Sequence, residues 1–216
     1  MTPALLVSVA ALIFTVASFW WLQARRGKLI MSSIPAFSGY VATDRRLGVR
    51  LPILLYNTGA RTRLVDELRL VFPPWDDGHA QWQTFHPTLK PESGDGDTAD
   101  FAGPYPIDGR RAVMRFVKFT YAFGPVLPEP VETLCRVEAR LDGSSAWTVV
   151  GSFTLYLGHM AYPDRFITYR NSVVPCDGEP ESTYSTWSDL AATRGLDAPW
   201  RDGKGPIVGG REGTIV

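Results

Sequence analysis

Residues 47–72, LGVRLPILLYNTGARTRLVDELRLVF, contain two runs in which apolar and polar side chains alternate across a short turn. In the first run an apolar residue occupies every second position: Leu47, Val49, Leu51, Ile53 and Leu55. The second run repeats the alternation with Leu68, Leu70 and Phe72. A period of two places successive side chains on opposite faces of a strand. The stretch therefore predicts two β-strands, each with one apolar face.

The turn between the two runs reads Asn57-Thr58-Gly59-Ala60. Turns that contain Asn and Gly favour hairpins because these residues tolerate a positive φ. We therefore predict that the two runs pair as a hairpin, with positive φ at Asn57 or Gly59. Within the first run, Pro52 cannot donate a ladder hydrogen bond, which predicts a sheet edge or a bulge at that position.

Other parts of the chain repeat the alternation. One run carries its apolar face on Val113, Val117, Phe119, Tyr121 and Phe123. A second hairpin pattern has the turn 142–145 at its centre and apolar positions on either side: Cys135, Val137, Ala139 and Leu141, then Trp147, Val149, Phe153, Leu155 and Leu157. Shorter candidates are 29–34, 80–85 and 165–170. Together these patterns predict about seven or eight strands.

Strands that each have one dry face are best buried when two antiparallel sheets pack together. The first prediction is therefore an all-β fold, an Ig-like or fibronectin-like antiparallel β-sandwich over 29–175. A small β-barrel is the alternative. Arg115 is unusual because it falls on the apolar face of its strand. It can snorkel at one end of the sandwich, or pair with an acidic residue of a partner.

The segment LPILLYNTGARTRLVDELRL, residues 51–70, also resembles a segment of uncharacterised bacterial single-span membrane proteins with an Ig-like domain. The resemblance extends over 47–72, about an eighth of the chain. It implies an Ig-like fold and a role in protein interaction, and it implies no reaction. The Cys…Trp…Cys pattern of antibody domains is missing from the sequence.

Residues 3–22, PALLVSVAALIFTVASFWWL, carry no charge. Twenty residues in a helix are about 30 Å long, which matches the hydrocarbon thickness of a bilayer. A cleaved signal peptide has a basic start and small residues before the cut. This run instead ends in Phe19-Trp20-Trp21. We therefore predict a transmembrane α-helix over 3–22 that is retained as a signal anchor.

The residues after the run predict how it sits in the membrane. Trp20 and Trp21 suit the headgroup layer, and the basic juxtamembrane linker 23–28 adds Arg25, Arg26 and Lys28. These five residues are the predicted membrane-interface anchors. Because the other flank has no Lys or Arg, the positive-inside rule places the N-terminus outside. The prediction is a single-pass inner-membrane protein with a cytoplasmic globular domain.

From residue 176 to residue 216 glycine, proline and serine dominate. This composition predicts a flexible tail, in which 188–195 can form a short helix. Cys176 opens the tail and Cys135 lies in a strand pattern. The two cysteines can be unrelated thiols or a disulfide that pins the tail.

Searching for metal ligands yields weak candidates. His79 and His86 are seven residues apart around a short strand, and odd spacing sends them to opposite faces. The acidic stretch 92–100 fails the calcium-loop pattern because Asp100 stands where glycine is required. We therefore predict no metal site and no cofactor.

The charge balance of the chain limits the classes of function that the sequence supports. With 22 Lys+Arg against 22 Asp+Glu, the chain has no general attraction for nucleic acid. The prediction is a non-enzymatic protein-interaction module whose partners are the lipid bilayer, through the helix, and an unknown protein. The alternative is a ligand-binding or hydrolytic module built on Trp75–His79, where two carboxylates precede an imidazole. The same residues can equally form a plain turn.

Overall fold

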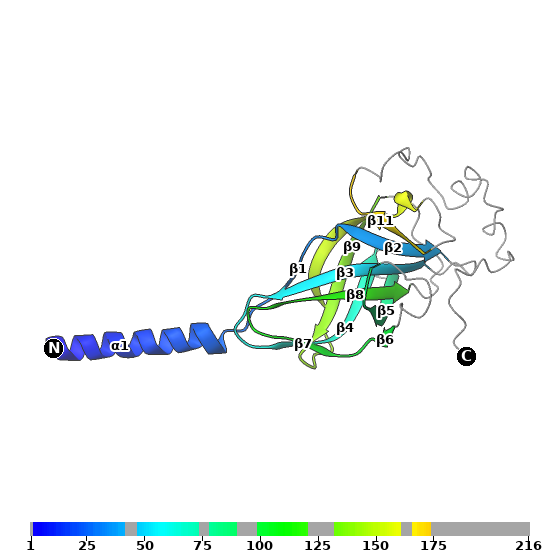
Figure 1. The fold of residues 1–216 in the computed structure, drawn as a ribbon. Coiled ribbons are helices and arrows are strands. Elements are labelled where there is room, and N and C mark those ends of the chain that lie inside the picture. Colours follow the sequence, from blue (N-terminus) through cyan, green and yellow to red (C-terminus); the bar gives the residue numbers. More distant parts are fainter. Residues whose placement is uncertain are drawn as a thin grey trace, which may run out of the picture.

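The computed structural model describes residues 2–41, 47–73, 78–89, 99–120, 132–160 and 166–173. An apolar helix projects from a β domain (Figure 1). The helix comprises α1 (Pro3–Phe19) and a π-helical turn, η1 (Trp20–Ala24). The strands are β1 (Leu29–Met31), β2 (Ala36–Val41), β3 (Leu47–Asn57), β4 (Arg63–Phe72), β5 (Gly78–His86), β6 (Asp100–Phe101), β7 (Tyr105–Ile107), β8 (Ala112–Thr120), β9 (Glu132–Leu141), β10 (Thr148–Tyr156) and β11 (Ile167–Arg170). A short 3-10 turn, η2 (Leu157–His159), follows β10.

All eleven strands belong to one antiparallel sheet with the order β10-β9-β4-β5-β8-β3-β2-β11, to which β1, β6 and β7 add on β3, β5 and β4. The antiparallel β architecture with one N-terminal helix confirms the coarse prediction, but the predicted number of seven or eight strands is too low, because the short strands β1, β6 and β7 pair on the sheet as well. The pairing places every strand in a single sheet, so the two-layer Ig-like sandwich stays a prediction.

The predicted hairpin at 47–72 is wrong, although both of its strands exist. β3 pairs with β8, β2 and β1, whereas β4 pairs with β9, β5 and β7. The residues between them lead the chain from one part of the sheet to another. The other predicted hairpin is confirmed, because β9 and β10 pair directly across a turn in which Asp142 and Gly143 have positive φ.

The sheet is curled (Figure 1), and the Asn171 side chain links its two ends. Asn171, directly after β11, accepts a hydrogen bond from the Tyr156 amide at 3.0 Å. Its side-chain amide donates to the carbonyls of Thr154 and Ile34, at 2.8 and 2.9 Å. The Asn171 side chain therefore joins β10 to the opposite end of the sheet. It satisfies backbone amide and carbonyl groups that a neighbouring strand would otherwise have to pair.

Pro52 faces a locally unpaired side of β3, as at a sheet edge, although β3 as a whole is an interior strand. On one side of β3, β2 pairs as far as Arg50 and β1 begins to pair at Leu55. The Ser32 amide donates to the carbonyl of Leu54. The backbone N–H and C=O groups of every second β3 residue, counted from Leu54, therefore point to this side of the strand. Pro52 lies two residues before Leu54, so its backbone nitrogen points to the same side, into the gap between β1 and β2. Among the residues that the structure describes, no strand accepts a hydrogen bond there, so the N–H that proline lacks costs the ladder nothing.

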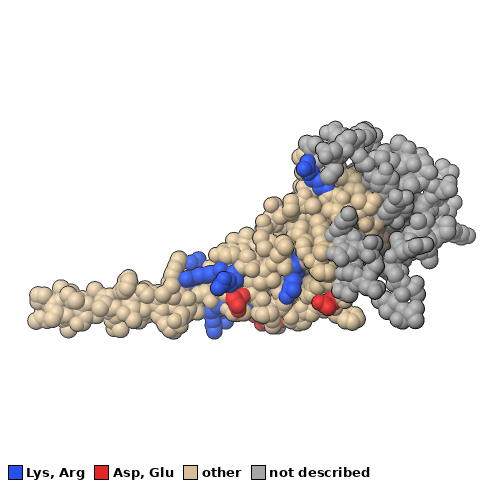
Figure 2. All heavy atoms as spheres, viewed as in Figure 1, with Lys and Arg blue, Asp and Glu red and all other residues tan. Residues whose placement is uncertain are grey.

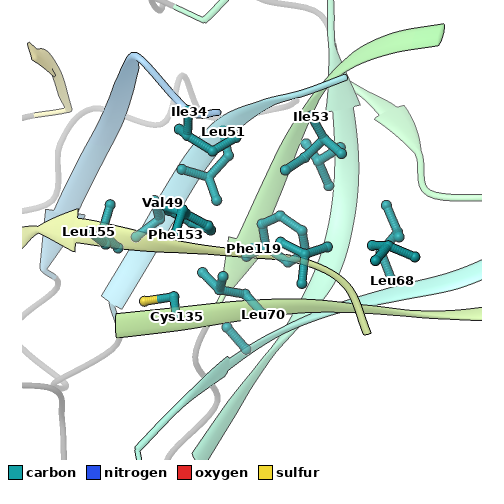
Figure 3. Close-up of a cluster of buried hydrophobic side chains, with 14 of the residues drawn as sticks. Ile34, Val49, Leu51, Ile53, Leu68, Leu70, Phe119, Cys135, Phe153 and Leu155 are labelled. Carbon is teal, nitrogen blue, oxygen red and sulfur yellow. The ribbon is translucent and has the colours of Figure 1, made fainter. Parts of the chain in front are cut away.

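The core fills the inside of the curled sheet (Figure 3). It is lined by the apolar faces predicted from the alternation, including Leu51, Ile53, Leu68, Leu70, Phe119, Cys135, Phe153 and Leu155. Arg115 occupies one of the alternating positions of β8 that face the core, and it lies opposite Ile53 of β3 in the strand register. Its guanidinium lies over the rings of Phe85 and Tyr105, at 5.6 and 5.9 Å, while the side chain is exposed.

Two predicted inward positions are wrong, Trp147 and Val149. Trp147 lies against the guanidinium groups of Arg69 and Arg140 on the outer face, at 4.2 and 4.7 Å. Val149 is 49% exposed, whereas its neighbour Val150 is buried at 6%. A register shift between Val149 and Gly151, opposite β9, inserts one extra residue and inverts the alternation. Phe153 and Leu155 then face the core as predicted. A bulge therefore changes which face of the sheet the side chains beyond it occupy.

A candidate membrane-facing junction

The N-terminal helix is long and apolar enough to cross a membrane. Residues Pro3–Ala24 form 22 helical residues with a mean hydropathy of 2.2, and none of the most apolar window is buried against the β domain. A helix of that length spans about 33 Å, slightly more than a hydrocarbon core. The predicted span 3–22 thus coincides with a helix that leaves its apolar surface unburied.

Trp21, one of the predicted anchors, is bound by two arginines. The guanidinium of Arg25 stacks on the Trp21 ring at 4.2 Å. The Nη2 of Arg110 donates to the Trp21 carbonyl at 3.0 Å. In the π-helical turn the Arg25 amide bonds back to Trp20 at 2.8 Å, so the Trp21 carbonyl is an orphan acceptor of the helix end. Arg110 satisfies that acceptor from the β domain.

The linker after the helix is hydrogen-bonded to the loop after β3. The Ala60 amide donates to the Arg25 carbonyl at 2.9 Å, and the Thr58 amide donates to the Lys28 carbonyl at 3.0 Å. In return, the Lys28 amide donates to the Thr58 hydroxyl oxygen at 2.9 Å. These bonds hold the predicted linker 23–28 against the β domain at residues 25 and 28.

Gly27 and Gly59 meet backbone to backbone at this contact. A Cβ on Gly59 would lie 2.1 Å from the Gly27 nitrogen, and a Cβ on Gly27 would lie 1.8 Å from the Gly59 nitrogen. Arg63 adds a bond from its Nη1 to the Gly27 carbonyl at 2.8 Å. Both glycines are therefore required by the close approach of two backbone segments.

The prediction of positive φ at Asn57 or Gly59 is wrong, because neither residue adopts it. Asn57 is instead fully buried. Its Oδ1 accepts from the Gly59 amide at 2.9 Å, and its Nδ2 donates to the carbonyls of Arg61 and Ile107, at 2.8 and 3.1 Å. Asn57 thus shapes the loop through its side chain, as asparagine commonly does in turns.

A third segment, 108–111 between β7 and β8, completes the junction. Arg110 has φ of 56°, in the left-handed region that non-glycine residues rarely occupy. Its amide donates to the Gly59 carbonyl at 2.8 Å, and the Asn57 amide donates to the Arg111 carbonyl at 2.9 Å. The backbone strain at Arg110 is thus maintained by bonds to the loop that also holds the linker.

Six cations lie on these three segments next to the end of the helix, and we call them the basic collar: Arg25, Arg26, Lys28, Arg61, Arg110 and Arg111. Arg25 is half-buried and the other five are exposed. Figure 2 shows Lys and Arg side chains gathered where the helix meets the β domain. The residues that the structure describes supply no ion-pair partner to any of the six.

Nearby acidic groups are already engaged. Asp142 forms an ion pair with Arg63 at 2.6 Å. Asp66 accepts from the Gly143 amide at 2.7 Å, and Asp108 accepts from the Thr62 hydroxyl at 3.1 Å. The charge of Arg63 is therefore matched within the protein, whereas the collar retains its charge.

An exposed apolar surface lies on the outside of the sheet, close to the collar. We call it the outer strip: Ile30, Leu54, Tyr56 and Met114. Ile30 lies opposite Tyr56, and Leu54 lies opposite Met114. Ile30, Tyr56 and Met114 are 51%, 42% and 53% exposed. The central strand β3 is thus apolar on both faces near the end that adjoins the helix.

The residues predicted for chemistry lie mostly outside the part of the chain that the structure describes. Trp75, Asp76 and Asp77 lie outside the described residues, as does the side chain of His79. His86 bonds to Thr84 at 2.9 Å within its own strand. Within the described ranges no three His, Cys, Asp or Glu side chains form a group that could hold a metal ion.

The structure describes Cys135 but neither Cys176 nor the C-terminal tail. Cys135 is a free thiol in the core, and burial raises its pKa well above the usual range. Cys176, the acidic stretch up to residue 98 and the predicted tail helix at 188–195 lie outside the described residues.

The five residues that the sequence predicts as anchors, Trp20, Trp21, Arg25, Arg26 and Lys28, all lie at the junction, and their contact with a membrane stays a prediction. Sequence reasoning missed Arg61, Arg110 and Arg111, because these residues are 33 or more positions from Lys28 in the sequence. The adjacent pair Arg110-Arg111 after Asp108-Gly109 is a visible basic turn. Only the fold brings that turn to the helix.

No family model and no curated protein matches this chain. One solved structure, a protein from Archaeoglobus fulgidus, is similar over 67% of this chain and 99% of its own length. The two chains share 11% sequence identity with a TM-score of 0.28. A similarity of that strength carries no inference about fold or function, and the resemblance to bacterial Ig-like proteins stays a prediction.

Proposed function

We propose that this chain is a non-enzymatic interaction protein that holds a β domain, Ig-like in character, at a membrane surface and docks a protein partner there. The observation that carries the proposal is the outer strip. Exposed apolar side chains that cluster on a sheet are typical of protein-binding surfaces. The strip lies on β1, β3 and β8, next to the loop that binds the end of the apolar helix.

The junction supports this proposal because it limits how the domain is presented. Bonds from Ala60 and Thr58 to the linker leave little freedom between helix and domain. A surface presented in one orientation loses less entropy when it binds a partner in the same membrane. We further propose the cytoplasmic side for the domain, in an inner membrane, because the collar cations follow the helix on its C-terminal side.

Site-specific photocrosslinking in native membranes tests the docking surface. The full chain carries a photoreactive amino acid in place of Met114, on the outer strip. The matched control carries it in place of Leu134, which is 50% exposed on β9. A reproducible protein adduct at 114 that is absent at 134, and that Tyr56→Asp abolishes, supports the proposal. Adducts of equal yield at both positions, or adducts with lipid alone, would overturn it.

A further inference from the structure

We infer that the basic collar is a binding surface for the headgroups of anionic phospholipids. The inference rests on the membrane anchoring proposed above, and it adds residues of the β domain to the membrane contact. Arg61, Arg110 and Arg111 come from loops of the folded domain rather than from the linker. Figure 2 shows Lys and Arg side chains gathered at the end of the helix, with an acidic side chain beside them.

The depth of these cations follows from their bonds to the helix end. If Pro3–Ala24 spans the hydrocarbon, Trp21 and Arg25 lie in the headgroup layer. Arg110 bonds directly to the Trp21 carbonyl, and Ala60, beside Arg61, bonds to the Arg25 carbonyl. The loops 58–63 and 108–111 therefore lie at the same depth as the headgroups.

The electrostatics of the collar favour an anionic surface. Of three nearby carboxylates, Asp142 is paired with Arg63, whereas Asp66 and Asp108 accept from neutral donors and keep their charge, so the six cations of the collar outnumber the unpaired carboxylates. The cations of the collar stay exposed and without an ion-pair partner among the residues described. Each Lys or Arg held at an anionic membrane surface raises affinity roughly fivefold at physiological salt.

Preorganisation distinguishes this surface from a basic tail. The Asn57 side chain and the bond from the Arg110 amide to the Gly59 carbonyl hold both loops in place before any lipid binds. Little conformational entropy is then lost when headgroups bind. A flexible polybasic segment would have to be ordered first.

The test measures lipid selectivity of the full chain reconstituted in bilayers. Bromine-labelled phosphatidylglycerol or phosphatidylcholine replaces part of the lipid, and quenching of tryptophan fluorescence reports which lipid contacts the helix end. Trp20 and Trp21 are 54% and 53% exposed there. The test variant is Arg61→Gln/Arg111→Gln, which retains the Arg110 bond to the helix. Arg170→Gln, at an exposed cation on β11 opposite Ala36, is the control.

We expect several-fold selectivity for phosphatidylglycerol, loss of that selectivity at high salt, and a decrease of fivefold or more in the double variant. Arg170→Gln should leave it unchanged. Equal quenching by both lipids would overturn the collar inference while anchoring stands. Full selectivity in the double variant would overturn the role of the loops. Quenching by neither lipid would instead overturn the anchoring itself.

Discussion

Gly59 shows how a single residue can decide the position of a whole helix. Its Cβ-free backbone lets the loop after β3 approach Gly27 so closely that both segments exchange hydrogen bonds. Sequence reasoning identified Gly59 as a turn residue on the basis of positive φ. The physical requirement is instead the space that a Cβ would occupy.

Replacing Gly59 by alanine should therefore lower the free energy of unfolding by about 2 kcal/mol, because the added Cβ meets backbone that has little room to move. Thermal or chemical denaturation of the full chain in detergent measures this loss. Gly103→Ala is the matched control, since a Cβ there meets nothing within 4 Å. Equal stability of the two variants would contradict the close backbone contact.

Cys135 provides a second test at the residue scale. Burial raises its pKa, so the thiol stays protonated at pH values where a free cysteine begins to ionise. In a Cys176→Ser background, alkylation of the folded protein at pH 8 should be at least about 100-fold slower than in denaturant. A rate close to that of the denatured chain would show that Cys135 is accessible.

At the scale of the elements, bulges change which side chains a strand buries. β10 follows the predicted alternation from Phe153 onward, but the shift before Gly151 buries Val150 in place of Val149. Gly151 lies where a Cβ would meet the Met31 side chain at 2.6 Å. The bulge and the glycine together let β10 lie close to β1.

The two valines make a matched pair of variants. Val150→Ala should lower stability by about 1–2 kcal/mol, because it removes buried methyl groups from the core. Val149→Ala should change stability by less than about 0.5 kcal/mol, because that side chain faces solvent. Equilibrium unfolding in urea compares them. The reverse order would place Val149 inside, as simple alternation predicts.

Closure of the sheet depends on a side chain at the end of β11. Asn171→Leu should lower stability by about 2–3 kcal/mol, because it leaves the Thr154 and Ile34 carbonyls and the Tyr156 amide without this partner. Hydrogen exchange should then accelerate at Tyr156 more than at Val137, which lies in the interior strand β9. Uniform acceleration across both strands would argue against a local role for Asn171.

At the scale of the whole molecule, the distribution of cations predicts on which side of a membrane the β domain lies. The collar and the linker place all their cations on the domain side of the helix, which predicts a cytoplasmic domain. A reporter active only in the periplasm, fused after residue 175, should be inactive, and a cytoplasm-active reporter at the same site should be active. The opposite pair of results would place the domain outside.

A charge variant tests the cause of that orientation. Arg25→Glu/Arg26→Glu/Lys28→Glu removes the linker cations that follow the helix, so a fraction of the molecules should invert. Arg170→Gln provides the control, because it changes a cation away from the helix. Unchanged orientation of the triple variant would mean that folding of the domain, or the remaining collar cations, sets the topology.

The local features of this protein follow from its sequence. Alternation at 47–55 and 135–141 identified strands, because side chains two apart share a face whatever the strand pairs with. The uncharged run at 3–22 identified the helix, because length and polarity alone decide whether a segment can span a bilayer. The anchors Trp20 and Arg25 were visible because they adjoin that run.

Long-range features were decided only by the tertiary structure. β3 and β4 adjoin in sequence but pair with other strands, because the loop between them is tied to Ile107 through Asn57 and to the linker through Thr58. The same ties bring Arg61 and Arg110 to the helix end. Pairing and closure depend on contacts between residues far apart in the chain, and alternation, a property of neighbours, carries no information about them.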